Sequence, residues 1–236
     1  MRIGLTSLYA WRPHVEHTHF LAELARAGGH EVRFLTCDGD LPSCYTRQLR
    51  DRPAWKECLQ CRVGGIRSFE SRGVSALSDF VPRRAPAPDA ASLDWTRSSA
   101  STLGRFESNA DFSSPEFHAL NAALAPSARM AHEAARQWIE REHLDAVILF
   151  NGRMDITRAV FEAARSLGKR VLSHERTWFG DGIQLLPDEH CLGLSSVWRL
   201  VSDWRDRPLT QDQALRAAAL VARRFLRRNQ TEWRAY

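Results

Sequence analysis

The sequence predicts an α/β fold in which helices cover both faces of a mostly parallel sheet. Short apolar segments at 2–7, 31–35, 146–150 and 169–173 alternate with segments whose apolar residues recur at helical spacing. Continuous apolar segments of this kind are typical of strands buried on both faces, as in parallel sheets. The 236 residues, 44% of them apolar, suffice for one large domain, so we expect a single domain over 1–236.

The N-terminal part predicts a first strand, a helix and a second strand. Val15, Leu21 and Ala25 lie on one apolar face of the helix, and the glycine pair 28–29 ends it. No G-x-G-x-x-G motif occurs at the strand-to-helix turn, which argues against a nicotinamide or flavin cofactor.

Four cysteines lie in an insertion at 37–61 with the spacing C-x6-C-x13-C-x2-C. Four thiolates can close a tetrahedral structural zinc site, and the C-x-x-C pair has the spacing of a zinc knuckle. Two alternatives stay open, a redox pair and separate, partly buried thiols. The candidate zinc ligands are Cys37, Cys44, Cys58 and Cys61.

Residues 68–114 lack periodicity and include Pro-rich and Ser-rich segments, which predicts a long loop. Ser114 and Pro115 predict the start of a helix, with proline at its first position. We expect Pro126 to interrupt this helix and Ser127 to cap a second one.

The segment 145–176 predicts one βαβ unit with parallel strands and a right-handed crossover. Asp155 is expected to cap the helix and Gly168 to end it. Polar residues follow both strands at their carboxyl ends, where open parallel sheets bind ligands. These candidate substrate-binding residues are Asn151, Gly152, Arg153, His174, Glu175 and Arg176.

An arginine-rich helix is predicted over 209–230, and the excess of arginine gives a net charge of +5 and a pI near 9.3. Its arginines either contact an anionic membrane surface or form a solvated face. No apolar segment reaches the length of a membrane span, and the first residues form a strand and not a signal peptide. We therefore expect a cytoplasmic protein, and the first of the two alternatives for the arginines would place it peripherally at the inner face of the cell membrane.

Several segments together resemble a known family. They are the opening strand with LAELARAGGHEV, the cysteine segments CDGDLPSC and CLQC, and FNGRMDITRAVFEAARSLGKRV with HERTWF. Over about residues 1–178 the chain resembles the N-terminal, acceptor-side domain of GT-B glycosyltransferases that build bacterial capsule and surface polysaccharides. The resemblance implies a Rossmann-like domain that forms one half of a GT-B fold.

The same resemblance implies the reaction and the partners. A sugar would pass from a nucleotide-sugar donor to a sugar or lipid-linked acceptor. The donor would bind a second domain, in the same chain after the helix at 209–230 or in a partner subunit. This chain is then expected to be inactive alone.

The loop after the first strand would reach the cleft between the two domains, where inverting members often place a general base. A base is needed because the acceptor hydroxyl loses its proton as it attacks the anomeric carbon. His17 or His14, oriented by Glu16, are the candidate catalytic residues. The alternative is that these residues cap the helix and face solvent.

In the candidate substrate site, Gly152 permits close approach of a ligand, and Arg153 suits a phosphate or carboxylate. Asn151 offers both a donor and an acceptor, and Glu175 can bind sugar hydroxyls. The alternative is structural, with a turn at the first strand end and an internal pair of Glu175 with Arg176 at the second.

A zinc-containing nucleic-acid-binding module is the alternative function. The C-x-x-C pair and the positive charge favour it. The charge is scattered, however, and Lys56 and Lys169 are the only lysines, so no specific nucleic-acid partner is expected.

Overall fold

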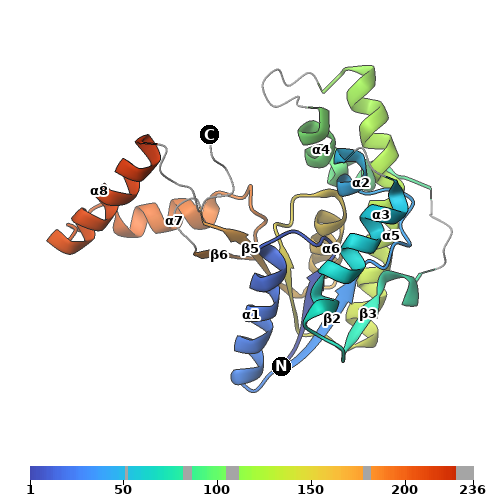
Figure 1. Ribbon diagram of the computed structural model, residues 1–236, viewed down its shortest axis with the longest axis horizontal. Coiled ribbons are helices and arrows are strands. Elements are labelled where there is room, and N and C mark those ends of the chain that lie inside the picture. The colour runs from blue at the N-terminus through green and yellow to red at the C-terminus, as the bar shows by residue number, and fades with distance from the viewer. Residues whose placement is uncertain (51–52, 82–86, 105–111, 178–181, 227–236) are drawn as a thin grey trace.

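The computed structural model describes residues 1–50, 53–81, 87–104, 112–177 and 182–226 (Figure 1). Six strands form one sheet in the order β3-β2-β1-β4-β5-β6, in which the first five strands run parallel and β6 runs antiparallel to β5. The predicted α/β class with a mostly parallel sheet is confirmed. The strands are β1 (Arg2–Ser7), β2 (Glu31–Thr36), β3 (Val74–Ala76), β4 (Ala146–Phe150), β5 (Arg170–Arg176) and β6 (Ile183–Pro187).

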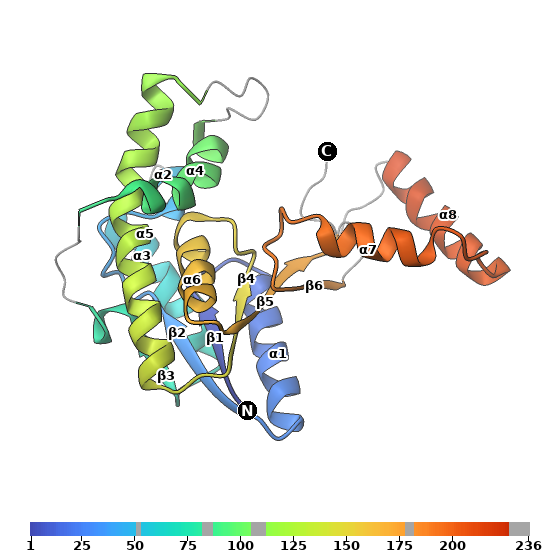
Figure 2. The same cartoon turned by 180° about the vertical axis from the view of Figure 1, so that it is seen from behind.

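Helices cover both faces of the sheet (Figures 1 and 2). Residues of α1 pack with β1 and β2 on one face, whereas α5 and α6 pack on the other. The helices are α1 (His14–Ala27), α2 (Tyr45–Leu49), α3 (Ala54–Gly64), α4 (Ala90–Gly104), α5 (Pro115–Arg141), α6 (Asp155–Ser166), α7 (Ser195–Trp204) and α8 (Gln211–Phe225), with short 3-10 helices η1 (Ile66–Ser68) and η2 (Leu77–Asp79).

The close fit of α5 to the sheet depends on Gly4 in β1. A Cβ atom at Gly4 would lie 2.5 Å from the Trp138 ring and 2.6 Å from Leu144. Trp138 is fully buried, so the glycine makes room for the largest side chain of the core.

The predicted βαβ unit at 145–176 is confirmed as β4, α6 and β5, with the two strands parallel. Gly168 follows the helix in a left-handed conformation (φ +66°), as expected for a residue that ends a helix. Asp155, in contrast, lies inside α6, and Met154 occupies the N-cap position.

The prediction of a long loop over 68–114 is wrong for β3, η2 and α4. The buried face of α4 consists of Ser92, Thr96, Ser99 and Ala100, so it shows no apolar periodicity. These small residues allow close packing against α5, and the Thr96 hydroxyl donates a hydrogen bond of 2.7 Å to Asn121. Residues 82–86 and 105–111 of the predicted loop lie outside the described residues.

The prediction that Pro126 interrupts the helix is also wrong, because α5 is continuous through it. Ala125 and Ala128 are fully buried on either side of the proline, so the packed face of the helix continues across it. Ser43 also packs at this position, where its backbone N–H donates a hydrogen bond of 2.9 Å to the Ser127 hydroxyl. Ser114 caps the helix as expected, with its hydroxyl accepting from the Phe117 N–H.

Helices α7 and α8 project away from the sheet beyond β6 (Figures 1 and 2), and α7 has no buried residue. The described part of the predicted helix at 209–230 forms α8 over 211–225, and residues 227–230 lie outside the described residues. Within the described ranges, none of the helices has both the length and the hydropathy needed to cross a bilayer.

Candidate functional site

The carboxyl ends of β4 and β5 place the predicted polar residues side by side. Phe150 pairs with His174 in the parallel register, and the Asn151 N–H donates a hydrogen bond of 2.9 Å to the His174 carbonyl. Asn151 and Gly152 both adopt left-handed conformations, with φ values of +67° and +70°. The chain therefore turns sharply at the end of β4, as predicted for Gly152.

Asn151 links this turn to the end of β5. Its Nδ2 donates a hydrogen bond of 2.7 Å to Oε2 of Glu175, and its Oδ1 accepts one of 3.0 Å from the Arg153 N–H. The other Glu175 oxygen accepts from the Arg176 N–H at 3.0 Å. These hydrogen bonds hold the Asn151 amide and the Glu175 carboxylate in fixed positions at the sheet edge.

Arg153 is positioned by helix α4. Its guanidinium donates to the Ser98 hydroxyl at 2.9 Å and to the Thr102 hydroxyl at 3.3 Å. Among the residues that the structure describes, no carboxylate lies within ion-pair distance of this guanidinium. Arg153 thus presents a charge that neutral hydroxyls hold in place, which suits an anionic ligand.

A cleft of about 820 Å³ opens at this edge of the sheet. Arg12, Arg50, Arg153 and Arg176 line it together with Asn151 and Glu175. Its aromatic wall contains Trp11, which stacks on Tyr9 with ring centroids 4.7 Å apart. The cleft therefore combines positive charge, a fixed amide–carboxylate pair and a half-buried aromatic ring, that of Trp11.

Asp155 supports that wall from behind. Its buried carboxylate accepts a hydrogen bond from the Tyr9 hydroxyl and one of 2.9 Å from the Tyr45 N–H. Its own N–H donates to the Ser99 hydroxyl at 2.7 Å. Burial raises the pKa of the Asp155 carboxyl and that of Tyr9. Asp155 therefore does not cap α6 as predicted. Its hydrogen bonds link the β1–α1 loop, α2 and α4 instead.

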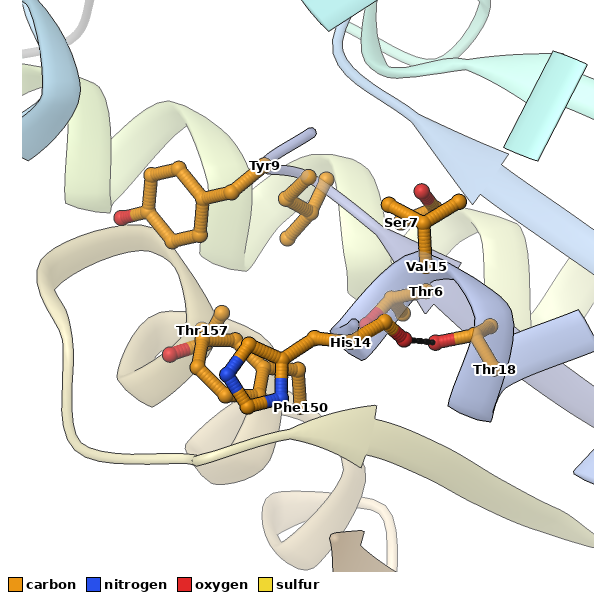
Figure 3. Close-up of a pocket in the computed structure, with 9 residues that line it drawn as sticks. Thr6, Ser7, Tyr9, His14, Val15, Thr18, Phe150 and Thr157 are labelled. Carbon is orange, nitrogen blue, oxygen red and sulfur yellow. Dashed lines mark hydrogen bonds between the residues drawn. The ribbon is translucent and has the colours of Figure 1, made fainter. Parts of the chain in front are cut away.

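Three histidines meet at the start of α1 and the end of β5. One ring nitrogen each of His14, His17 and His174 lies within 4.8 Å of the other two. The His14 ring packs on Phe150 with centroids 3.9 Å apart (Figure 3). His14 Nε2 also lies 3.7 Å from a Glu175 oxygen.

The surroundings keep these rings neutral. Burial lowers the pKa of His14 to about 3 and that of His174 to about 3, and it also lowers the pKa of His17. The alternative, that the helix-start histidines face solvent, fails for His14, which is 7% exposed. Glu16 hydrogen-bonds to Arg12 and not to a histidine.

A small cavity of about 10 Å³ lies beside His14 and has the volume of one water molecule (Figure 3). Thr6, Thr18 and Thr157 are among its lining residues. The Thr18 hydroxyl donates a hydrogen bond of 2.9 Å to the His14 carbonyl, which fixes the first turn of α1.

The four cysteines of the insertion lie near one another, because Cys58 and Cys61 are among the groups that raise the pKa of Cys37, and Cys37 and Cys61 are among those that raise the pKa of Cys44. Two groups of His, Cys, Asp or Glu in the described part of the chain have ligand atoms within 4.8 Å of one another, and neither contains a cysteine. Cys58 and Cys61 lie one turn apart on α3, whereas Cys44 precedes α2. Burial raises the pKa of Cys37 to about 11, so its thiol stays protonated at neutral pH. The cysteines are therefore neighbours whose sulfur atoms do not meet at ligand distance, and the zinc site stays a prediction.

Sequence reasoning placed His14 and His17 in one group and His174 in another. Only the parallel pairing of β1 with β4 and of β4 with β5 brings α1 next to the end of β5. The signal available in the sequence was the position of each group just after a predicted strand.

Comparisons with protein-family models, curated proteins and solved structures found no match to the chain.

Proposed function

We propose that this chain is the acceptor-binding half of a glycosyltransferase, and that its cleft binds an anionic sugar acceptor such as a sugar phosphate. The observation that carries the proposal is the composition of the 820 Å³ cleft. Arg153 and Arg176 match a phosphate or carboxylate, and the Asn151–Glu175 pair offers a donor and acceptors to sugar hydroxyls. Trp11 offers a ring for stacking on the sugar.

In the proposed reaction, an acceptor hydroxyl attacks the anomeric carbon of the donor sugar. A new glycosidic C–O bond forms as the bond to the diphosphate oxygen breaks, and the nucleoside diphosphate leaves. The hydroxyl proton passes to a base. His17 suits this role better than His14, because a pKa of about 3 makes His14 a weak base at neutral pH.

The nucleotide-sugar donor would bind a second Rossmann-like domain, in the same chain or in a partner subunit. The proposal therefore predicts that this chain binds the acceptor without turning it over. It also predicts that the cleft prefers a sugar phosphate to a nucleotide-sugar.

Isothermal titration calorimetry with a hexose phosphate, the neutral hexose and a nucleotide-sugar tests the proposal. We expect the phosphate to bind most tightly and Arg153→Gln to weaken it at least tenfold. The control is Arg170→Gln, since Arg170 is exposed outside the cleft and pairs with Asp188. Equal binding of the phosphorylated and neutral sugars, or tightest binding of the nucleotide-sugar, would contradict the assignment.

A further inference from the structure

We propose that His14, His17 and His174 form a binding site for one divalent transition-metal ion, with zinc as the best match. The three rings come from α1 and β5, and one nitrogen of each lies within 4.8 Å of the others. Three imidazoles that leave a fourth position open are a ligand set that suits zinc. This inference needs no substrate, and it replaces the role of His17 as the base, because an imidazole whose lone pair binds a metal cannot accept a proton.

Each ring also has a nitrogen without a protein partner. In the described part of the chain, the Nδ1 atoms of His14, His17 and His174 are buried and accept or donate no hydrogen bond. Buried polar atoms nearly always have a partner. Three unpartnered nitrogens on rings that approach one another this closely point to a shared ligand.

The tautomer of His174 follows from its neighbour Thr18. The Thr18 hydroxyl has one proton and donates it to the His14 carbonyl at 2.9 Å. It therefore accepts from the Nε2–H of His174 at 3.2 Å. The lone pair of His174 is then on Nδ1, the atom that has no protein partner.

His14 is oriented in a similar way by a carboxylate. Its Nε2 lies 3.7 Å from Oε1 of Glu175, which favours the proton on Nε2 and leaves the lone pair on Nδ1. Glu175 is itself held by hydrogen bonds from Asn151 and from the Arg176 N–H. A carboxylate behind a histidine is the arrangement that orients metal-ligating imidazoles.

The second group of ligand-type side chains shows a different pattern. His19, Glu23 and Glu70 also lie within 4.8 Å of one another, but Arg26 already donates to both glutamates. His19 hydrogen-bonds to Glu70 at 3.1 Å. The acceptors of this group thus already have an arginine as their partner, whereas the Nδ1 atoms of the three histidines have no such donor among the described residues.

Metal binding by the full chain tests the proposal. We expect the purified protein to retain one zinc per chain after dialysis against metal-free buffer, measured by inductively coupled plasma mass spectrometry. After chelation, titration with Co²⁺ should give a visible absorption band that saturates at one equivalent. No retained zinc and no saturable Co²⁺ band in the unmodified chain would overturn the site.

Two variants remove a ligand while keeping the fold. In His174→Gln, the glutamine amide can still donate a hydrogen bond to Thr18 from near the position of Nε2, but Nδ1 is lost. His17→Gln changes the least buried of the three rings. Each should weaken Co²⁺ binding at least tenfold, with unchanged far-ultraviolet circular dichroism. His30→Gln, in the turn after α1, is the matched control and should bind as the unmodified chain does. Unweakened binding in both ligand variants, or loss of metal in Cys58→Ser instead, would refute the assignment.

Discussion

Asn151 Nδ2 donates a hydrogen bond of 2.7 Å to Oε2 of Glu175, and this contact joins the ends of two neighbouring parallel strands. The two residues are 24 positions apart, with α6 between them. Both line the cleft, so the contact sets the spacing of its polar groups.

Asn151 is expected to stabilise the fold through both its amide and its backbone. Asn151→Gly keeps the left-handed conformation (φ +67°) and loses only the side-chain bonds, at a cost of about 1–2 kcal/mol. Asn151→Ala should cost roughly 1 kcal/mol more, because alanine is strained at this φ. Urea unfolding of both variants measures the difference, and equal stabilities would show that the backbone is not strained.

Gly152 should tolerate a side chain less well than Gly168. Both have positive φ, but a Cβ at Gly152 would lie 3.0 Å from Ser173 Oγ and from His190 Cβ, whereas Gly168 has open space around it. Gly168→Ala is expected to cost roughly 1 kcal/mol from the backbone alone. Gly152→Ala should cost about 1–3 kcal/mol beyond that. Similar midpoints in chemical denaturation would mean that the turn at Gly152 has room to shift.

Asp155 is expected to be one of the most sensitive positions of the cleft wall. Asp155→Ala leaves the Tyr9 hydroxyl and the Tyr45 N–H buried without their acceptor, which should cost about 2–5 kcal/mol. Asp155→Asn keeps one acceptor oxygen and should cost less. Guanidinium unfolding compares the two, and an alanine variant as stable as the asparagine variant would contradict the role of the carboxylate.

His132 is expected to make the fold sensitive to acid. The ring stacks on Trp95 at 4.6 Å, and its burial lowers its pKa below the usual 6.5. Above about pH 6.5 the residue is neutral in both states. As the pH falls below that value, the unfolded chain binds a proton that the folded chain resists, so stability is lost.

His132→Phe keeps the stacked ring and removes the titrating group. The fall in melting temperature between about pH 7.5 and about pH 5.5 should therefore be smaller than in the unmodified chain, because an unfolded histidine takes up its proton within this range. His118→Gln, exposed on the same helix, serves as the control and should leave that fall unchanged. An identical fall in His132→Phe would remove His132 as a source of acid sensitivity.

Two tryptophans are expected to differ strongly in their contribution to stability. Trp138 is fully buried against Gly4, so Trp138→Ala should cost about 3–5 kcal/mol. Trp198 on α7 is 65% exposed, and Trp198→Ala should change stability by no more than about 0.5 kcal/mol. Thermal and urea unfolding measure both. A large loss in the Trp198 variant would show that α7 is packed in solution.

The parts of the fold that follow apolar periodicity were predictable from the sequence. The strand 146–150 and the helix after it agree with their predicted positions, because apolar residues recur at the spacing of each element. The next strand, predicted over 169–173, continues to Arg176, so His174, Glu175 and Arg176 are its last three residues and do not follow it. The helix α4 was not predictable in this way, since hydroxyl and methyl groups form its buried face.

The candidate site was predictable only in its separate parts. Each polar group was placed correctly at a strand end, because strand direction in a parallel sheet determines which ends meet. The meeting of His174 with His14 and His17 depends on strand order, which local patterns do not specify. Cysteine spacing also suggested a metal site, and the fold places these cysteines near one another without bringing three of their sulfur atoms within 4.8 Å of one another.

The hydrogen bonds of Asp155 have a consequence for the order of folding. Its three partners Tyr9, Tyr45 and Ser99 lie 146, 110 and 56 positions away in the chain. Contacts between such distant positions carry a high loop-closure cost and form only once other elements have brought the chain together. The wall of the cleft is therefore expected to assemble late, after helices and adjacent strands. A folding intermediate that precedes this step would contain most of the secondary structure but no binding site.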